Sequence, residues 1–382
     1  MSNNPTDTLK NYRFSMNGKD CSGIVKRVTI HQSLTEPFMK GIFDFTDSMN
    51  IIPESAANTP FNVSITTQAG QSLNCNLIIE KFMDTQVSQA SGKYLNGSLR
   101  LISPEFGKAV QNRPVGQFND QPAEKIVEQM VKKELGSNKK LTTDKAKNVS
   151  GEFLVQKQSP TEIINKATRL NGTGEPYVFF EDKDGFNWRS LKKMSEQGAA
   201  HTFYTNHAAY TNISAANDPN VILDCVFNYG GVGDAAVANK QQDTRYSVET
   251  QKKEDASKAP NYSPVASRYV QGLQDTKNNR EISNNPEQNE KKRGDDFAKQ
   301  EQYMSNLSGR MKFMVTLNPN VKPGQTINTN IAAGSGMTQG NYKSSHSGKW
   351  LIKSVTHICD FSDGGGAPYG RTIIECVGKL QW

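Results

Sequence analysis

The segment around Asp182, Asp184 and Gly185 has the residue types of a metal-binding motif. Its spacing matches part of a calcium-binding loop, in which glycine occupies the sixth of about twelve positions. That alignment places Phe180 at the first ligand position and Leu191 at the twelfth, and neither side chain carries a carboxylate. We therefore predict a hairpin turn here and no calcium site.

A second motif, formed by Gly231, Gly233 and Ala236, has the G-x-G-x-x-A spacing of a dinucleotide-binding loop. Such a site requires a packed helix whose N-terminus holds the pyrophosphate. The residues that follow, AVANKQQDTRYS, offer no apolar face on which a helix could pack. We therefore interpret this segment as a loop.

Histidine and cysteine do not cluster in the sequence. The five histidines are scattered and none stands in an H-E-x-x-H pattern: His31, His201, His207, His346 and His357. The five cysteines have no C-x-x-C spacing and lie mostly in apolar runs: Cys21, Cys75, Cys225, Cys359 and Cys376. This pattern is typical of buried free thiols.

Other catalytic signatures are also missing from the sequence, including a complete P-loop, a G-x-S-x-G motif and the kinase motifs. We predict no catalytic, cofactor-binding or metal-binding residue, no cofactor and no enzymatic activity. An activity assembled from residues far apart in the chain stays open at this point.

Composition narrows the class of protein further. The 382 residues predict roughly two to four domains. The net charge is +7, but residues 234–310 mix 13 basic with 12 acidic side chains, which argues against nucleic-acid binding. No apolar run approaches the roughly 18 to 20 residues that span a bilayer, and the first residues lack the apolar centre of a signal peptide. We expect a soluble protein made in a cytoplasm.

The clearest local structure lies between Ser159 and Met194. Residues 159–162 form a capping box with proline at the first helical position, and Gly172 ends the predicted helix. Residues 177–181 and 186–191 predict the two strands of an aromatic hairpin. Its aromatic side chains form either a core strand pair or a surface buried between subunits.

Period-2 alternation of apolar and polar residues predicts strands over most of Gly23–Ser103 and again near the C-terminus. Two predicted helices lie between these β-rich regions. The predicted organisation is an N-terminal arm at 1–17, a first β-barrel at 18–103, an inserted α+β module at 104–185, a second, discontinuous β-barrel at 186–230 plus 311–382, and a polar loop and helix insertion at 231–310.

A weak internal repeat connects the two β-rich regions. LIIEKFMDTQ is followed by a polar glycine turn, Tyr94 and SLRLIS, and LIKSVTHICDF is followed by a glycine-rich turn, Tyr369 and RTIIECV. This pattern of strand, turn, tyrosine and strand indicates either two related barrels or a coincidence between two β-rich segments.

The helix followed by YVFFEDKDGFNWRSL, behind a series of predicted strands, resembles the hub protein of contractile phage tails and the base of the VgrG spike of type VI secretion. The segment GIFDFTD also fits the tube-like barrel of this family. The resemblance covers roughly Gly18 to Val377. It implies a mainly β protein with two tube-like antiparallel β-barrels that form a pseudo-hexameric ring as a trimer.

By the same resemblance, the protein is a structural subunit of the virion baseplate, assembled in the host bacterial cytoplasm. It joins a six-fold tail tube or tube-initiator protein above to a three-fold cell-puncturing spike below, with baseplate wedge components around it. It lines a channel through which DNA passes without specific binding. The alternatives are a spike-base component of a type VI secretion system or phage-like bacteriocin and, with less support, a cell-wall-degrading tail enzyme.

Overall fold

The computed structural model describes residues 9–49, 51–53, 57–88, 94–118, 121–149, 153–173, 175–205, 218–228, 244–247, 252–255, 310–331, 347–361 and 367–378. The fold is mainly β, as the sequence predicted. The described residues form one 13-stranded sheet and three smaller sheets. None of the helices in these ranges is both long and apolar enough to traverse a bilayer.

Six strands make up what we call the N-terminal strand set. They are β1 (Leu9–Met16), β3 (Val25–Ser33), β4 (Lys40–Asp47), β5 (Pro60–Thr67), β6 (Ser72–Ser88) and β7 (Tyr94–Ile102), with the short β2 (Lys19–Asp20) and a 3-10 turn at Ser22–Ile24 between β1 and β3. They pair in the order β1-β5-β6-β7-β4-β3, and every pairing is antiparallel.

The alternation along these strands buries one face of each. In β5, Phe61, Val63 and Ile65 face the core while the residues between them stay exposed or half-exposed. Phe43 stacks its ring edge on Phe61 at 4.8 Å and lies 5.9 Å from Phe14. Each such side chain contributes about 1.5–3 kcal/mol to folding by leaving water, so this aromatic cluster is a main source of stability.

The predicted N-terminal arm is wrong for residues 9–16, which form β1 and pair with β5. Phe14 and Met16 are buried in the core. The polar residues of LKNYRFSM conceal the strand because only every second side chain has to face the core. Residues 1–8 of the arm lie outside the described residues.

The α+β module follows the N-terminal strand set. Its helices are α1 (Glu105–Gln111), α2 (Ala123–Gln129) extended by a π-helical turn (Met130–Glu134), α3 (Pro160–Arg169) and α4 (Leu191–Glu196). Its strands are β8 (Gly116–Gln117), β9 (Lys140–Thr143), β10 (Leu154–Val155), β11 (Tyr177–Asp182) and β12 (Gly185–Ser190). The capping box at the start of α3 is confirmed, since the Ser159 and Glu162 side chains cap each other's backbone.

The predicted domain boundary at residue 185 is wrong. It falls inside the β11–β12 hairpin, and β12 also pairs in parallel with β9 of the module. The hairpin therefore belongs wholly to the module, and the next strands of the large sheet begin at His201. The aromatic side chains on the two strands are buried within the chain, which favours the core strand pair over the subunit interface.

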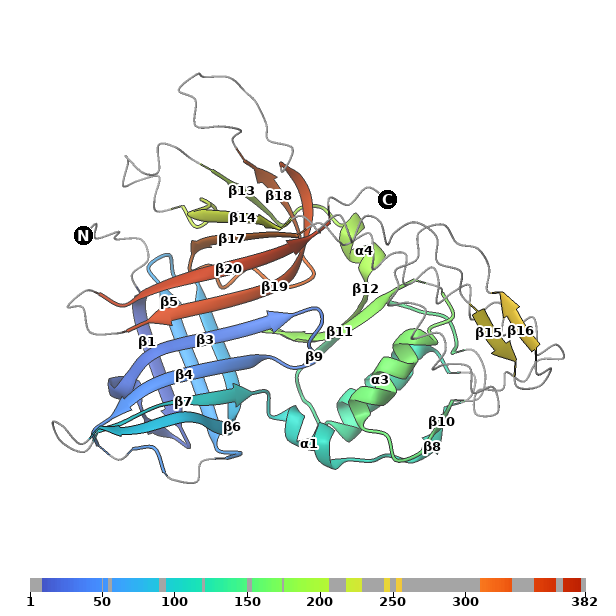
Figure 1. Ribbon diagram of the computed structural model, residues 1–382, viewed down its shortest axis with the longest axis horizontal. Helices are drawn as coiled ribbons and strands as arrows, with labels where there is room; N and C mark the ends of the chain where they lie inside the picture. Colours follow the sequence, from blue (N-terminus) through green and yellow to red (C-terminus); the bar gives the residue numbers. More distant parts are fainter. Residues whose placement is uncertain are drawn as a thin grey trace, which may run out of the picture.

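Six more strands make up the C-terminal strand set. They are β13 (His201–Tyr204), β14 (Asp224–Asn228), β17 (Arg310–Thr316), β18 (Thr326–Asn330), β19 (Gly348–Asp360) and β20 (Tyr369–Val377). They pair in the order β13-β18-β19-β20-β17-β14. Figure 1 shows them beside the N-terminal strand set, with the helices of the α+β module to one side.

The polar insertion predicted at 231–310 is described at only a few places. A patternless loop was predicted around residues 235–260, but β15 (Thr244–Ser247) and β16 (Lys252–Asp255) pair there as an antiparallel hairpin. Its register sets Arg245 opposite Glu254. The Gly231–Ala236 motif and the predicted helix at 285–309 lie outside the described residues.

Candidate functional site at the junction of the two strand sets

The two strand sets share one strand order. Numbered by their place in the chain, the strands of each set lie in the spatial order first, fourth, fifth, sixth, third, second. Four of the five pairings also agree in direction. The exception is the outer pair, which is antiparallel in β1·β5 and parallel in β13·β18.

The two strand sets also share one shift in pairing register. In β6 the register against β7 shifts between Ile79 and Lys81, and in β19 the register against β20 shifts between Ile352 and Ser354. Glu80 and Lys353 are therefore the extra residues of two equivalent β-bulges, which bend a strand and increase its twist. Equivalent positions can be counted outward from these bulges, from one paired strand to the next. The residues that pair just after the bulges, Arg100 in β7 and Glu375 in β20, are equivalent. On the next strands Ile42 is equivalent to Lys312, and on the strands after those Thr29 is equivalent to Val226.

The two sets join through an antiparallel pairing of β19 with β3, which makes the large sheet continuous. Side chains reinforce the joint at both ends. Arg27 Nη2 lies 2.6 Å from Asp360 Oδ2, and the His31 and Thr356 side chains hydrogen-bond at 2.8 Å. The two halves of the chain are thus held together by a backbone ladder and not by side-chain packing alone.

One buried histidine lies within this joint. His357 of β19 is fully enclosed, and its Nδ1 lies 3.0 Å from the Thr372 hydroxyl of β20. Burial, with a smaller effect from the Lys183 ammonium, lowers the pKa of His357 to about 3. The ring is therefore neutral at pH 7 and acts as a packed, hydrogen-bonded part of the sheet.

A second junction connects the N-terminal strand set to the α+β module through a half-buried cation. Lys139 Nζ lies 2.6 Å from Glu181 Oε1 and 2.7 Å from Glu105 Oε2, and donates to Ser103 Oγ at 3.1 Å. Glu181 Oε2 also accepts the Met39 backbone N–H at 3.0 Å and the Ser103 hydroxyl. This polar cluster connects the start of β4, the end of β7, α1 and β11.

Burial raises the pKa of the Glu181 carboxyl, and the Lys139 ammonium opposes that shift. For Lys139, burial favours the neutral amine, but Glu181 and Glu105 outweigh it and raise the pKa above its ordinary value. The ammonium is therefore charged at pH 7, and its removal would leave two buried carboxylates without their shared cation.

The β11–β12 hairpin packs on both of its faces. On one face, Phe179, Phe186 and Trp188 join the core of the α+β module. On the other face, Phe180 packs with Leu34, directly after β3 of the N-terminal strand set, and with Leu351 in β19 of the C-terminal strand set. The hairpin is therefore the element at which all three parts of the chain meet.

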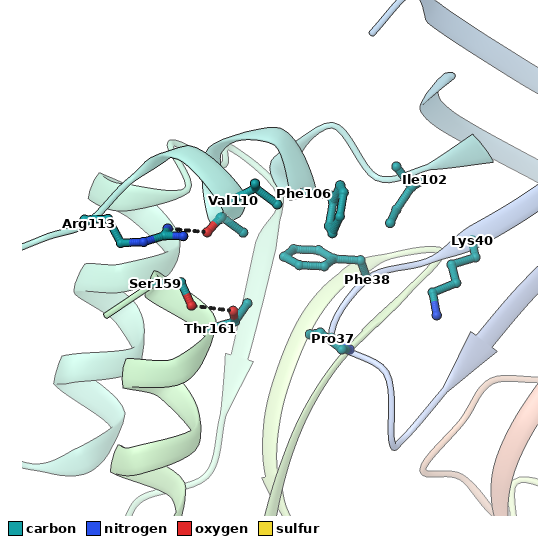
Figure 2. A pocket seen from close by; sticks show the side chains of 10 residues that line it. Pro37, Phe38, Lys40, Ile102, Phe106, Val110, Arg113, Ser159 and Thr161 are labelled. Atoms are coloured by element: carbon teal, nitrogen blue, oxygen red, sulfur yellow. Dashed lines mark hydrogen bonds between the residues drawn. The ribbon is translucent and has the colours of Figure 1, made fainter. Parts of the chain in front are cut away.

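An open, mostly apolar pocket of about 320 Å³ lies between the β3–β4 connection, α1 and the start of α3. Figure 2 shows Phe38 and Phe106 next to each other in its lining, with Lys40 and Arg113 at opposite ends. The two rings meet edge to face at 5.9 Å. The pocket's lining offers cations, hydroxyls and apolar surface, and no carboxylate, histidine or thiol that would exchange a proton near neutral pH.

No family model matches the chain, and no curated protein matches it at a significant level. Among solved structures, the 43 kDa tail protein of prophage MuSo2 from Shewanella oneidensis aligns with 96% of this chain and 97% of its own length, at 13% identity and a TM-score of 0.57. The tail protein from Neisseria meningitidis MC58 aligns over 97% of both chains, at 11% identity and a TM-score of 0.58. The chain has the fold of these tail proteins.

The motifs weighed in the sequence have structural roles wherever they are described. Asp182 Oδ1 accepts the backbone N–H groups of Asp184 and Gly185, which makes the predicted turn, and Asp184 pairs with Lys322. Four cysteines are buried and Cys225 is half-buried, all as free thiols, and burial raises the thiol pKa of Cys75 to about 12. In the described ranges, no group of His, Cys, Asp or Glu side chains is arranged to hold a metal.

The sequence analysis missed the Lys139 cluster. Glu181 stands inside the apolar run YVFFED, and an acidic residue within a buried strand signals a buried partner of opposite charge. The partner itself is 42 residues away along the chain. Only the pairing of β9 with β12 brings the two together, and that pairing has no local sequence signal.

Proposed function

We propose that the protein is a structural hub subunit of a contractile phage tail baseplate. Three copies form a ring around a central channel, with the six-fold tail tube above and the three-fold spike below. The subunit transmits position and load, and it performs no catalytic step. It resides in the virion baseplate, and DNA passes through its channel without specific binding.

The observation that carries this proposal is the repeated strand order within one chain. Three copies, each with two strand sets of the same order and register, present six nearly equivalent units under three-fold symmetry. Closed rings are the usual form of homo-oligomers. An adaptor between a six-fold and a three-fold partner needs six similar units arranged with three-fold symmetry. Each chain would supply two of these units.

The junctions suit a subunit under load. The β3·β19 ladder couples the two strand sets through a continuous row of backbone hydrogen bonds. The Lys139 cluster and the β11–β12 hairpin fasten the α+β module to the same sheet. The module lies to one side of the strands in Figure 1, where it is available to baseplate wedge components.

The likeness in fold to two tail proteins over nearly their full length supports a role in a tail. It leaves the partners to experiment, since a fold alone does not fix a function.

The test is the mass and symmetry of the assembled protein. Light scattering should give three times the chain mass of 42.3 kDa for the protein alone, or that mass plus the mass of the spike for the complex, and averaged electron micrographs should show a ring with six similar lobes. Interruption of the gene should yield particles that lack a joined tube and spike. A monomer in the presence of tube and spike proteins, or normal particles after interruption, would contradict the proposal.

A further inference from the structure

The joint between the two strand sets uses two particular edges. One is the outer edge of β3, the second strand of the N-terminal strand set. The other is residues 354–360, the later part of β19, which is the fifth strand of the C-terminal strand set. The earlier part of β19 pairs with β18, so only its later part is available to another partner.

The edge of β3 has an equivalent in the C-terminal strand set, and the edge of β19 has an equivalent in the N-terminal strand set. The counterpart of β3 is β14, and the counterpart of residues 354–360 of β19 is residues 81–88 of β6. Among the described residues, β14 pairs with β17 alone, and residues 81–88 of β6 pair with β7 alone. Within the part of the chain that the structure describes, one joint is therefore made, while the two edges of an equivalent second joint have no partner strand.

The two leftover edges lie at opposite ends of one run of strands. That run is β14-β17-β20-β19-β3-β4-β7-β6. A single copy cannot bring its own ends together without bending the run into a closed barrel. The β14 end of one copy can instead pair with the β6 end of a second copy, and the same contact repeated between successive copies closes a ring.

Side-chain exposure marks the same two edges. Val226 in β14 is 57% exposed and Met83 in β6 is 41% exposed, and both are large apolar side chains. Unpaired strand edges are hazards that native proteins cover or pair. Apolar side chains on such an edge indicate a partner strand in the assembled protein.

We infer that β14 of one copy pairs antiparallel with residues 81–88 of β6 in the next copy, repeating between chains the β3·β19 joint within each chain. The inference rests on the proposed trimer and names its subunit interface. The register follows from the internal repeat. Thr29 lies opposite Ile358 within the chain, so Val226 lies opposite Gln86 across the interface.

The neighbouring positions follow in the same register. Val28 lies opposite Cys359 in the internal joint, which sets Cys225 opposite Val87 in the new one. β6 has a second register shift between Phe82 and Thr85 that β19 lacks. The positions of Gln86 and Val87 are therefore counted through their partners in β7, Asn96 and Leu95.

Disulfide cross-linking tests this register. The variant Val226→Cys with Gln86→Cys should, on mild oxidation of the assembled protein, give covalent dimers and trimers on a non-reducing gel. Val226→Cys with Asn62→Cys is the matched control, because Asn62 is exposed on β5, away from the predicted joint. Thr29→Cys with Ile358→Cys is the internal standard, and it should cross-link within one chain without any increase in mass.

The outcomes separate the inference from the proposed function. Cross-linking of the 226–86 pair at least tenfold above the 226–62 pair supports the interface. A trimer in which the internal standard forms and the 226–86 pair does not would overturn the interface and leave the hub proposal standing. If light scattering of the unmodified protein with its spike gives only monomer, the hub proposal fails, and the interface with it.

Discussion

Glu80 in β6 and Lys353 in β19 occupy the same bulge position of two equivalent strands and carry opposite charges. Glu80 Oε2 lies 2.8 Å from Arg100 Nε, and Lys353 Nζ lies 3.1 Å from Glu375 Oε1. Arg100 and Glu375 are themselves equivalent positions. An ion pair therefore occurs at the same place in both strand sets with its polarity reversed, so the bulge accommodates either polarity.

This reversal predicts that the charges of the first pair can be exchanged. Glu80→Lys should lower the free energy of unfolding by up to about 1 kcal/mol, because the new lysine lies beside Arg100 in a partly solvated site. Adding Arg100→Glu should recover most of that loss. Urea unfolding of the two variants measures both steps. A double variant no more stable than Glu80→Lys alone would contradict the prediction.

Lys139 should be much more sensitive than an exposed lysine. Lys139→Met removes the cation shared by two buried carboxylates and should cost about 3–5 kcal/mol in unfolding free energy. The matched control is Lys125→Met, since Lys125 forms a solvent-exposed pair with Glu128 at 2.9 Å, and its loss should shift the unfolding midpoint far less. Equal shifts in the urea midpoints of the two variants would show that the buried cluster adds nothing.

Gly324 and Gly70 form a natural pair for a steric test. Their φ angles are +79° and +77°, so alanine is strained to a similar extent at either position. A Cβ at Gly324 would lie 2.7 Å from Met194 Sδ and 3.1 Å from Phe180 Cζ, whereas a Cβ at Gly70 would meet nothing within 4 Å.

Gly324→Ala should therefore destabilise the protein by about 1–3 kcal/mol more than Gly70→Ala, because it overpacks the contact beneath the hairpin. Thermal unfolding measured side by side gives the difference. If the two melting temperatures fall by the same amount, the packing of the hairpin against the β18 turn tolerates the added methyl group.

His357 makes stability depend on acid. Its pKa is lowered to about 3 in the folded protein by burial, while the unfolded chain has the ordinary value of 6.5. Between these values the unfolded chain binds a proton that the folded protein does not. Stability from this group is thus complete above pH 6.5 and falls by up to about 1.4 kcal/mol per pH unit toward pH 3.

The variant His357→Gln removes that proton-binding group. Its unfolding free energy, measured from pH 7 to pH 4, should fall less steeply than that of the unmodified protein. Burial also lowers the pKa of His31, so that residue contributes in the same direction and remains in the variant as a smaller slope. Identical slopes for the two proteins would mean that His357 is protonated, or exposed, in the folded state.

Local features of the fold could be predicted from the sequence because their signals are local. The capping box at Ser159 and the turn at Asp182 are each decided by residues three or fewer positions apart. The alternation in β5 likewise needs only its own eight residues. In these segments, residues close together in the sequence make most of the contacts that decide the structure.

The equivalence of the two strand sets could be suspected but not established from the sequence. Equivalent positions differ in charge, as at Glu80 and Lys353, and in size, as at Gly41 and Met311. What repeats is the hydrogen-bonding register, which many side chains satisfy equally well. The Lys139 cluster and β1 were missed for a similar reason, because each depends on a distant strand that no local pattern identifies.

The β3·β19 joint has a consequence for synthesis. Arg27 and its partner Asp360 are 333 residues apart, so the outer edge of β3 has no partner until nearly the whole chain has been made. At about 5–20 residues per second, translation leaves that edge open for roughly tens of seconds. During this interval the nascent chain exposes a strand edge to other nascent chains, and long-range pairing is in any case slow to form. Ribosome-bound chaperones that cover β3 until β19 emerges would raise the yield of folded protein more than added stability in the finished sheet.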